Sequence, residues 1–176
     1  MILDFFHISA NLKKIPRQGW IDKLSIDSPE SVADHVFSMA MMGMIFSDLE
    51  NYNTGKILKI ILLHDLAESI IGDMTPEQIS KEEKTALENK AIKKILNYLP
   101  ISLQKQYDVL WEEYQSNNSK EARIVHQLDK LEMALQAKIY SNDGYSKEKL
   151  DSFFNSARDE ITDPKLSELF RKISEK

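Results

Sequence analysis

The sequence predicts an all-α fold, a bundle of about six to eight helices. Apolar residues recur at helical spacing along most of the chain, and no segment alternates apolar and polar residues as a half-buried strand does. Gly and Pro number only five each, whereas Ala, Leu, Ile, Lys and Glu are plentiful. Because 176 residues support one sizeable core and are few for two, we expect residues 1–176 to form a single domain.

Three helices are expected in the first part of the chain, and they span residues 3–12, 28–50 and 54–72. The segment between the first two contains Pro and Gly and is expected to be irregular. Ser28 suits an N-cap and Pro29 suits the first helical position, so we place the start of the second helix there. The third helix is apolar nearly all round, which indicates a central position.

The rest of the chain is expected to form four or five more helices, separated by breaks at Pro100, Asn117–Ser119 and Asn142–Gly144. Ser80 and Glu83 have the spacing of a capping box, in which each side chain bonds the backbone N–H of the other. These helices span residues 81–99, 101–115, 120–140, 147–160 and 164–174.

Composition excludes several classes of function. The net charge of −5 argues against nonspecific binding to nucleic acid, although a local pocket of basic residues and metal could still bind a phosphate-bearing small molecule. The chain has no Cys, which excludes disulfides and thiolate zinc sites. The N-terminus does not resemble a secretory signal, and no stretch is apolar over the length of a membrane span. We therefore expect a cytoplasmic protein without a membrane partner.

Four residues give the strongest indication of chemistry, namely His35, His64, Asp65 and Asp129. They lie on three of the expected helices. Two imidazoles and two carboxylates suit a divalent transition metal and leave room for water in its coordination sphere. Such an ion makes water a nucleophile at neutral pH. If these side chains meet in the fold, a metal-dependent hydrolase is indicated.

Taken singly, each of these residues has an ordinary explanation. His35 could be a hydrogen-bonded core residue, and Asp129 could be the buried partner of an Arg or a Lys. His64 and Asp65 could mark a helix end that faces water. Glu68 lies four residues after His64, so one face of the third expected helix would hold both. Three polar groups at the end of so apolar a helix are costly unless something satisfies them, and a cation would do so.

Three further features are interpreted as structural. The four Met residues between positions 39 and 44 suit adaptable core packing. His126 lies nearly one turn before Asp129 but is left out of the ligand set. Residues 81–84 are expected to form the solvated first turn of a helix, although one of its lysines could reach a substrate.

The order of these residues, His35, then His64–Asp65, then a distant Asp129, resembles the signature of the HD-domain phosphohydrolases. The resemblance is closer to the 5′-deoxynucleotidase branch of that family, and it extends from about Leu12 to Tyr140. Four segments occur in family order: Ile15–Trp20 (IPRQGW), Ser28–His35 (SPESVADH), His64–Asp73 (HDLAESIIGD) and Gln127–Met133 (QLDKLEM). Jointly they are specific, whereas a His-Asp pair alone would not be.

The resemblance implies a role for each of these positions. His35, His64, Asp65 and Asp129 would bind one divalent metal ion, with cobalt or manganese as the ions that the family uses. Glu68 would be a catalytic acid or base beside the ion. Asp73 would be a second catalytic residue that orients water or protonates the leaving 5′-oxygen. The alternatives are a solvated Glu and a turn-forming Asp.

Candidate substrate contacts lie in two loops. Arg17 can bind a phosphate through two hydrogen bonds, and Trp20 can pack against a sugar or base. Bacterial relatives have an adjacent Arg-Trp pair, whereas two residues separate Arg17 from Trp20 here, so Trp20 could instead anchor its loop to the core. Thr75 and Pro76 could shape the sugar pocket.

The function expected from this resemblance is hydrolysis of deoxyribonucleoside 5′-monophosphates to deoxynucleoside and phosphate. One alternative is an HD-type hydrolase of nucleoside triphosphates or cyclic phosphodiesters. Another is a non-catalytic interaction module in which the metal is structural. A homodimer is implied by the resemblance, with apolar surface on the first or fifth expected helix as the candidate contact.

Overall fold

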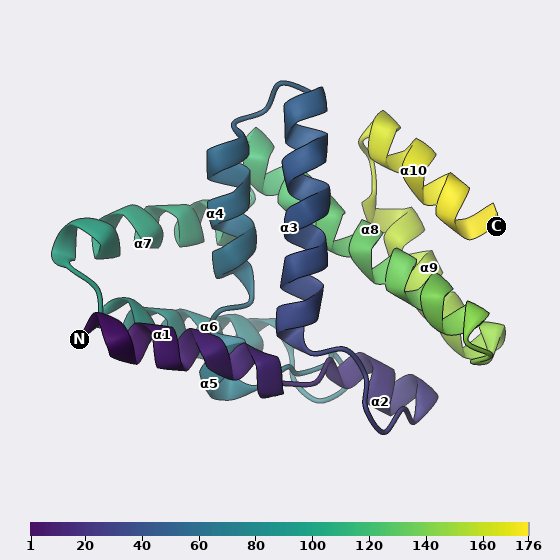
Figure 1. Ribbon diagram of the computed structural model, residues 1–176, viewed down its shortest axis with the longest axis horizontal. Coiled ribbons are helices and arrows are strands. Elements are labelled where there is room, and N and C mark those ends of the chain that lie inside the picture. The colour runs from purple at the N-terminus through teal and green to yellow at the C-terminus, as the bar shows by residue number, and fades with distance from the viewer. Residues whose placement is uncertain (176) are drawn as a thin grey trace.

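The computed structural model describes residues 1–175, and this part of the chain is all-α, as predicted (Figure 1). It contains ten α-helices and one short 3₁₀ helix, with no strand among the described residues. Their bounds are α1 (Ile2–Ala10), η1 (Asn11–Lys14), α2 (Gln18–Leu24), α3 (Val32–Leu49), α4 (Thr54–His64), α5 (Glu68–Ile71), α6 (Lys81–Leu96), α7 (Ile101–Ser116), α8 (Lys120–Asn142), α9 (Lys147–Glu160) and α10 (Pro164–Glu175).

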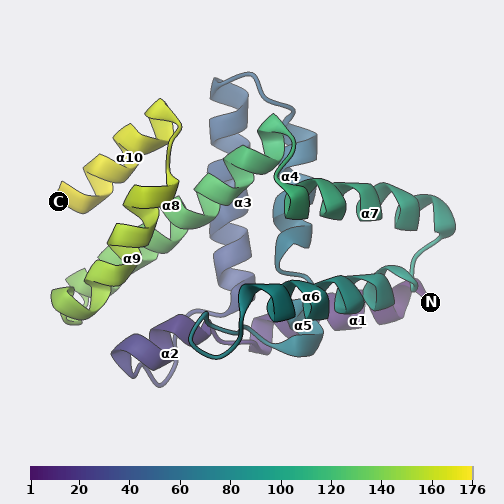
Figure 2. The same ribbon diagram turned by 180° about the vertical axis from the view of Figure 1, so that it is seen from behind.

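The antiparallel pair α3 and α4 stands at the centre of the fold (Figure 1). The long helix α8 crosses α3, as Figure 2 shows from behind, and α7 packs against α4. Met39, Ile57, Ile61 and Leu128 are completely buried where α3, α4 and α8 meet. Because α3 and α4 are antiparallel, the first turn of α3 and the last turn of α4 lie at the same end of the pair.

Helix α3 begins three residues later than the sequence analysis placed it. Ser31, not Ser28, is the N-cap, and its hydroxyl accepts the backbone N–H of Asp34 while the Asp34 carboxylate accepts the backbone N–H of Ser31. Ser31 is held extended against Pro16, because Arg17 N donates to Glu30 O at 3.0 Å and Val32 N donates to Ile15 O at 2.8 Å. The local start signal at Ser28 and Pro29 was therefore overridden by pairing with a distant segment.

The third expected helix is not continuous. Helix α4 ends at His64, and the chain passes through a tight turn before α5 begins at Glu68. In this turn Leu66 N donates to Leu63 O and Glu68 N donates to Asp65 O, each a three-residue hydrogen bond in place of the four-residue α-helical one. The prediction that His64 and Glu68 share one face of one helix was therefore wrong.

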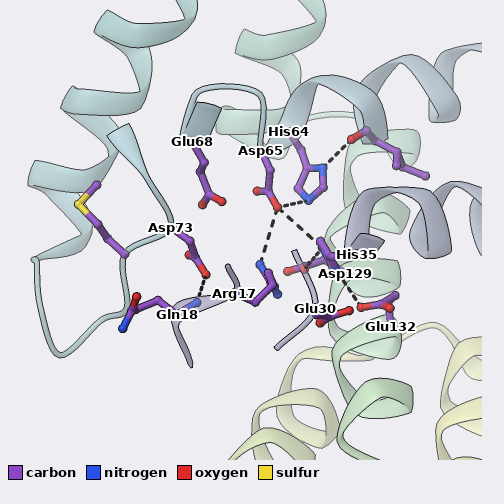
Figure 3. Close-up of polar contacts among 12 residues, drawn as sticks. Arg17, Gln18, Glu30, His35, His64, Asp65, Glu68, Asp73, Asp129 and Glu132 are labelled. Carbon is purple, nitrogen blue, oxygen red and sulfur yellow. Dashed lines mark hydrogen bonds and ion pairs between the residues drawn. The ribbon is translucent and has the colours of Figure 1, made fainter. Parts of the chain in front are cut away.

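The turn has a consequence for the adjacent residues His64 and Asp65. On a straight α-helix, neighbouring side chains point about 100° apart. The helix break at Asp65 instead lets both side chains reach the same centre (Figure 3). At the far end of α5, Gly72 adopts a φ of +79°, which glycine tolerates, and the chain turns toward Asp73 as predicted.

The segment that the sequence analysis treated as irregular contains η1 and α2. Trp20 and Leu24 on α2 pack into a second apolar cluster with Tyr140 on α8 and Leu150 on α9. These two short helices and the division of residues 54–72 raise the helix count above the expected number. The remaining boundaries match the expectation within a few residues, including the Ser80–Glu83 capping box at the start of α6.

In the part of the chain that the structure describes, no helix has both the length and the apolar character needed to cross a bilayer.

Candidate active site

The structure brings together all four residues of the expected ligand set (Figure 3). His35 Nε2 lies 3.3 Å from Asp129 Oδ1 and 3.8 Å from Asp65 Oδ2, and His64 Nε2 lies 3.1 Å from the same Asp65 oxygen. Ligand atoms of His35, His64 and Asp129 all lie within 4.8 Å of one another. His35 and Asp129, which are 94 positions apart in the sequence, therefore face the same small volume.

Three elements position these side chains. His35 lies in the first turn of α3, His64 is the last residue of α4, and Asp129 lies on α8. The antiparallel packing of α3 against α4 sets the two histidines side by side, with ring centroids 5.6 Å apart. Because α8 crosses α3, its Asp129 reaches the same point from the other side.

The donor set fits a divalent cation. His35 Nε2, His64 Nε2 and Asp65 Oδ2 are buried and have no hydrogen-bond partner. Buried polar atoms without partners are costly, and buried charges are usually paired or coordinate a metal. A cation among these three atoms would satisfy all of them. Two imidazole nitrogens and two carboxylates suit a borderline divalent ion.

The second nitrogen of each histidine is already engaged. His35 Nδ1 lies 2.6 Å from Glu132 Oε2, and His64 Nδ1 lies 2.6 Å from the backbone carbonyl of Ile61. Since a carbonyl oxygen can only accept, His64 Nδ1 donates its hydrogen there. In both residues, Nε2 is then the nitrogen that faces the centre of the site.

The acidic character of the site favours a positive charge within it. Burial and the charge of Arg17 lower the pKa of His35, but the nearby carboxylates of Asp129 and Glu132 outweigh them and raise it to about 10. Burial alone would raise the pKa of the Asp65 carboxyl, yet His64, His35 and Arg17 hold it well below its usual range. Without a metal, the site therefore binds a proton at His35, and a cation would displace it.

The pKa of the Glu68 carboxyl is shifted in the opposite direction to that of Asp65. Burial raises the pKa of its carboxyl well above the usual range, and the charges of Asp65 and Asp73 raise it further. The side chain is only 2% exposed, and its Oε2 has no hydrogen-bond partner. Lys84 Nζ lies 3.2 Å from Glu68 Oε1 and partly opposes the shift. A buried carboxyl group with a raised pKa can donate or accept a proton near neutral pH.

Asp73 borders the same pocket. Its Oδ2 accepts the backbone N–H of Gln18 at 2.8 Å, which ties the exit of α5 to the start of α2 (Figure 3). Its Oδ1 lies 3.9 Å from Lys84 Nζ. Asp73 thus joins the segment around Gln18 to the loop that follows α5, and these two segments hold the expected substrate contacts.

A cavity of about 620 Å³ is lined by His64, Asp65 and Asp129, while His35 lies behind them, completely buried. Its size is within the range of small-molecule sites. Arg17, Trp20, Thr75 and Pro76, the expected substrate contacts, all line it. Further lining residues come from α6, α7, α8 and α9, and they include Lys84, Tyr114, Lys130, Met133 and Phe153.

Arg17 and Trp20 are placed differently within this pocket. Arg17 Nη1 lies 3.8 Å from Asp65 Oδ2, so the guanidinium group faces the ligand set. Trp20 is 1% exposed, its Nε1 donates to Glu30 Oε1, and its ring packs against Tyr140 and Phe153. These contacts favour the alternative in which Trp20 anchors its loop, with an edge of the ring at the cavity wall.

Thr75 and Pro76 line the same cavity from the loop that follows α5. Thr75 is buried, and its hydroxyl donates to Asp22 Oδ2 at 3.3 Å, whereas Pro76 is exposed. The loop that contains both residues is therefore fixed to α2.

Sequence reasoning missed the roles of several residues. For Lys84 it preferred a solvated turn over a lysine that reaches the substrate, but the Lys84 ammonium group is directed at Glu68, Asp73 and the Met74 carbonyl. It did not single out Glu132, although Glu132 lies three residues after Asp129 and so on the same side of α8. This three-residue spacing from Asp129 was the feature of the sequence that could have identified Glu132 as a neighbour of the site. His126 stacks on Tyr114 and directs Nε2 to a backbone carbonyl, away from the ligand set.

Comparison with models of known protein families identifies a family to which this geometry corresponds. A family model described as "HD domain" matches residues 9–169.

This chain belongs to the HD-domain family.

Curated relatives of this HD-domain protein match it over nearly the whole chain. A human protein named 5′-deoxynucleotidase HDDC2 is 38% identical over 173 residues, which cover 98% of this chain and 84% of the relative. A protein of the same name from Dictyostelium discoideum is 42% identical over 178 residues, covering 95% of this chain and 93% of the relative.

Solved structures show the same HD-domain fold. A conserved hypothetical protein from Pyrococcus furiosus superposes with a TM-score of 0.81 at 30% identity, and the match covers 99% of each chain. A protein from Pyrococcus horikoshii superposes with a TM-score of 0.79 at 34% identity, covering 97% of this chain and 95% of the other.

Proposed function

We propose that this HD-domain protein is a metal-dependent 5′-deoxynucleotidase that hydrolyses deoxyribonucleoside 5′-monophosphates to deoxynucleoside and phosphate. The observation on which this rests is the convergence of His35, His64, Asp65 and Asp129 on one small volume beside a cavity of nucleotide size. Buried atoms of His35, His64 and Asp65 in this volume have no hydrogen-bond partner. Relatives named 5′-deoxynucleotidase, at 38% and 42% identity, support the substrate class.

The proposed ligands of one divalent ion are His35, His64, Asp65 and Asp129, with cobalt or manganese as the expected ion. When bound, the ion supplies a Lewis acid that lowers the pKa of water and offsets charge on the phosphoryl group. The two histidines present Nε2 to the site because Nδ1 of each is engaged elsewhere. The site needs no rearrangement of these rings to bind an ion.

Arg17 is the proposed phosphate-binding residue. Its guanidinium group lies at the ligand set and is only 16% exposed. A guanidinium group can donate two parallel hydrogen bonds to a phosphate. The backbone N–H of Arg17 donates to Glu30 O at 3.0 Å, which fixes the loop from which the side chain extends.

Glu68 and Asp73 are the proposed catalytic residues. In this proposal Glu68 takes a proton from the attacking water. Its carboxyl group lines the cavity, and its pKa is raised above the ordinary value, which makes it a stronger base than a solvated Glu. Asp73 is placed to orient that water or to pass a proton to the leaving 5′-oxygen. Lys84 holds the two carboxyl groups near each other.

The deoxyribose would lie against the wall made by Thr75, Pro76 and the edge of Trp20. All three residues line the cavity, and two of them are fixed by hydrogen bonds to neighbouring elements. A rigid wall can exclude a 2′-hydroxyl group, which is the basis expected for preference of deoxynucleotides over ribonucleotides.

A panel of nucleotides tests this function directly. The purified protein is stripped with a chelator and assayed with dAMP, dCMP, dTMP and AMP, with and without cobalt or manganese. We expect phosphate release that requires the added ion and is faster for deoxynucleotides. Turnover without metal, or a preference for AMP, would contradict the proposal. Release of triphosphate from a dNTP would instead indicate the triphosphohydrolase alternative, and no turnover would favour an interaction module.

We further propose that the protein forms a homodimer through α3. Its outward face exposes Phe37, Met41, Ile45 and Leu49, which recur every four residues and so form one stripe. Beside the stripe lies an apolar groove of about 700 Å³ between α3, α8 and α10. Contiguous exposed apolar surface of this kind is typical of protein interfaces. This position differs from the first and fifth expected helices, although α1 and α7 also expose apolar residues.

A further inference from the structure

The two histidines of the site are held by acceptors of different charge. His64 Nδ1 meets a neutral backbone carbonyl, that of Ile61, within its own helix. His35 Nδ1 meets the carboxyl group of Glu132, which comes from another helix, at 2.6 Å. Figure 3 shows Glu132 beside His35, on the side away from Asp65.

The His35–Glu132 contact is enclosed by protein. His35 is completely buried and Glu132 is 2% exposed, so water does not compete for the imidazole hydrogen. The neighbouring carboxyl group, that of Glu30, accepts the indole N–H of Trp20 through Oε1. Glu132 is therefore the group positioned to accept from His35.

We propose that Glu132 is a positioning residue for the metal site. Its carboxylate accepts the Nδ1 hydrogen of His35, which fixes the tautomer with a free electron pair on Nε2 and fixes the plane of the ring. The inference rests on the proposed metal site. A carboxylate that accepts the Nδ1 hydrogen of a ligating histidine also makes Nε2 a stronger electron-pair donor to the metal. A neutral carbonyl has a smaller effect of this kind.

The position of Glu132 on α8 makes the arrangement rigid. Asp129 and Glu132 are three residues apart, so one turn of one helix supplies both a proposed ligand and the acceptor that orients another ligand. His35 Nε2 lies 3.3 Å from Asp129 Oδ1 while its Nδ1 contacts Glu132. The imidazole thus bridges two side chains of the same turn, and its rotation would break one contact or the other.

The test compares Glu132→Gln and Glu132→Ala with the wild-type protein. Metal-stripped protein is titrated with Mn²⁺ and Co²⁺ by calorimetry, and the visible absorption spectrum of the Co²⁺ form is recorded. We expect the dissociation constant to rise about 10-fold in Glu132→Gln and toward about 100-fold in Glu132→Ala. The smaller effect is expected for Gln because its amide oxygen can still accept the Nδ1 hydrogen but has no charge. The Co²⁺ absorption bands should shift in both variants.

Glu121→Ala is the matched control. Glu121 is also a buried carboxylate on α8, but it pairs with Lys56 and lies outside the pocket lining. Its removal should lower the melting temperature without changing metal affinity, which separates loss of stability from loss of ligand orientation. Should Glu132→Ala fail to fold, the near-isosteric Gln variant still decides the outcome.

The results distinguish this inference from the proposed function. Metal affinities within about twofold of wild type in both folded Glu132 variants, with unshifted Co²⁺ bands, would overturn the positioning role even if the enzyme is active. A wild-type protein that binds neither ion would instead overturn the proposed metal site, and this inference with it.

Discussion

At the scale of single residues, Glu68 is the group whose chemistry depends most on its surroundings. It lies at the start of the four-residue helix α5, is almost completely buried, and faces Asp65, Asp73 and Lys84. A solvated Glu would be ionised at neutral pH, but its low pKa would make it a weak base for taking a proton from water. The break after His64 is what places this carboxyl group inside the pocket.

We expect Glu68→Gln to lower kcat by about 10²- to 10⁴-fold, because the amide cannot transfer a proton. Metal affinity should stay near that of wild type, since Glu68 is not among the proposed ligands. Glu88→Gln is the control, because Glu88 also lines the cavity near Lys84 but lies outside the proposed chemistry. Equal losses in both variants, measured by steady-state assay with saturating metal, would contradict the assigned role.

Glu30 gives a prediction about pH and stability. Burial raises the pKa of its carboxyl, and the charge of Glu132 adds to this, bringing it to about 7. Because the folded pKa lies above the unfolded one, the folded state holds a proton that the unfolded chain has released. This group therefore favours the unfolded state increasingly as pH rises from about 4.5 to about 7.

Glu30→Gln cannot ionise but can still accept the Trp20 indole N–H. We expect its melting temperature, relative to wild type, to rise steadily between about pH 5 and pH 8 in metal-free protein. Thermal unfolding across that pH range makes the comparison. Glu112→Gln is the control, because Glu112 is exposed and its replacement should leave the pH dependence of the melting temperature unchanged. Parallel curves for wild type and Glu30→Gln would show that Glu30 does not titrate in this window.

The sequence predicted the four ligand candidates because their residue types and order are unusual in combination. It did not assign Glu132 or Lys84 to the site, because Glu and Lys are usually solvated, and spacing alone does not distinguish a buried side chain from an exposed one. Trp20 was ambiguous for a similar reason. Its burial depends on Tyr140 and Phe153, which are more than a hundred residues away along the chain.

At the scale of elements, the contact between α3 and α4 determines the distance between the two histidines. Gly43 on α3 lies against α4, and a Cβ atom built there would lie 2.4 Å from Ile61 Cδ1 and 3.2 Å from Ile57 Cγ2. Both isoleucines are completely buried, so neither can move freely. A glycine at this position allows the two helices to approach closely.

We expect Gly43→Ala to reduce the free energy of unfolding by about 1–3 kcal/mol through overpacking. Ile61→Val removes the Cδ1 atom that the new methyl group would meet. The double variant should therefore be more stable than the sum of the single effects predicts, as measured by urea unfolding. Strictly additive effects would mean that the new methyl group is accommodated elsewhere.

Helix boundaries were predictable where a single local signal decides them. The capping box of Ser80 and Glu83 is formed as expected. At the start of α3 two candidate caps competed, and the choice of Ser31 over Ser28 depends on the Asp34 carboxylate and on backbone pairing with Ile15. The break at Asp65 was not predictable, because the apolar pattern continues through it.

At the scale of the whole molecule, the exposed stripe on α3 predicts the state of assembly. We expect Ile45→Lys to convert a dimer to a monomer, because a charge at the centre of an apolar interface is left without a partner. Sedimentation velocity measures this. Val109→Lys, at an exposed apolar position of α7, is the matched control and should leave the dimer intact.

A monomeric wild-type protein would contradict the homodimer. Dissociation by Val109→Lys but not by Ile45→Lys would place the interface on α7, one of the helices first expected to form it. The sequence could not distinguish these faces, because an amphipathic helix that packs within the chain has the same pattern as one that packs against a partner.

Binding of the proposed ion where α3, α4 and α8 meet would also make the lifetime of the protein depend on the supply of that ion. An ion held there joins three distant segments and binds the native state but not the unfolded chain, so saturation at a thousand times the dissociation constant would add about 4 kcal/mol of stability. Starvation for that nutrient would leave a looser molecule that proteases cut more readily. A cell deprived of the ion would then lose the polypeptide as well as its activity.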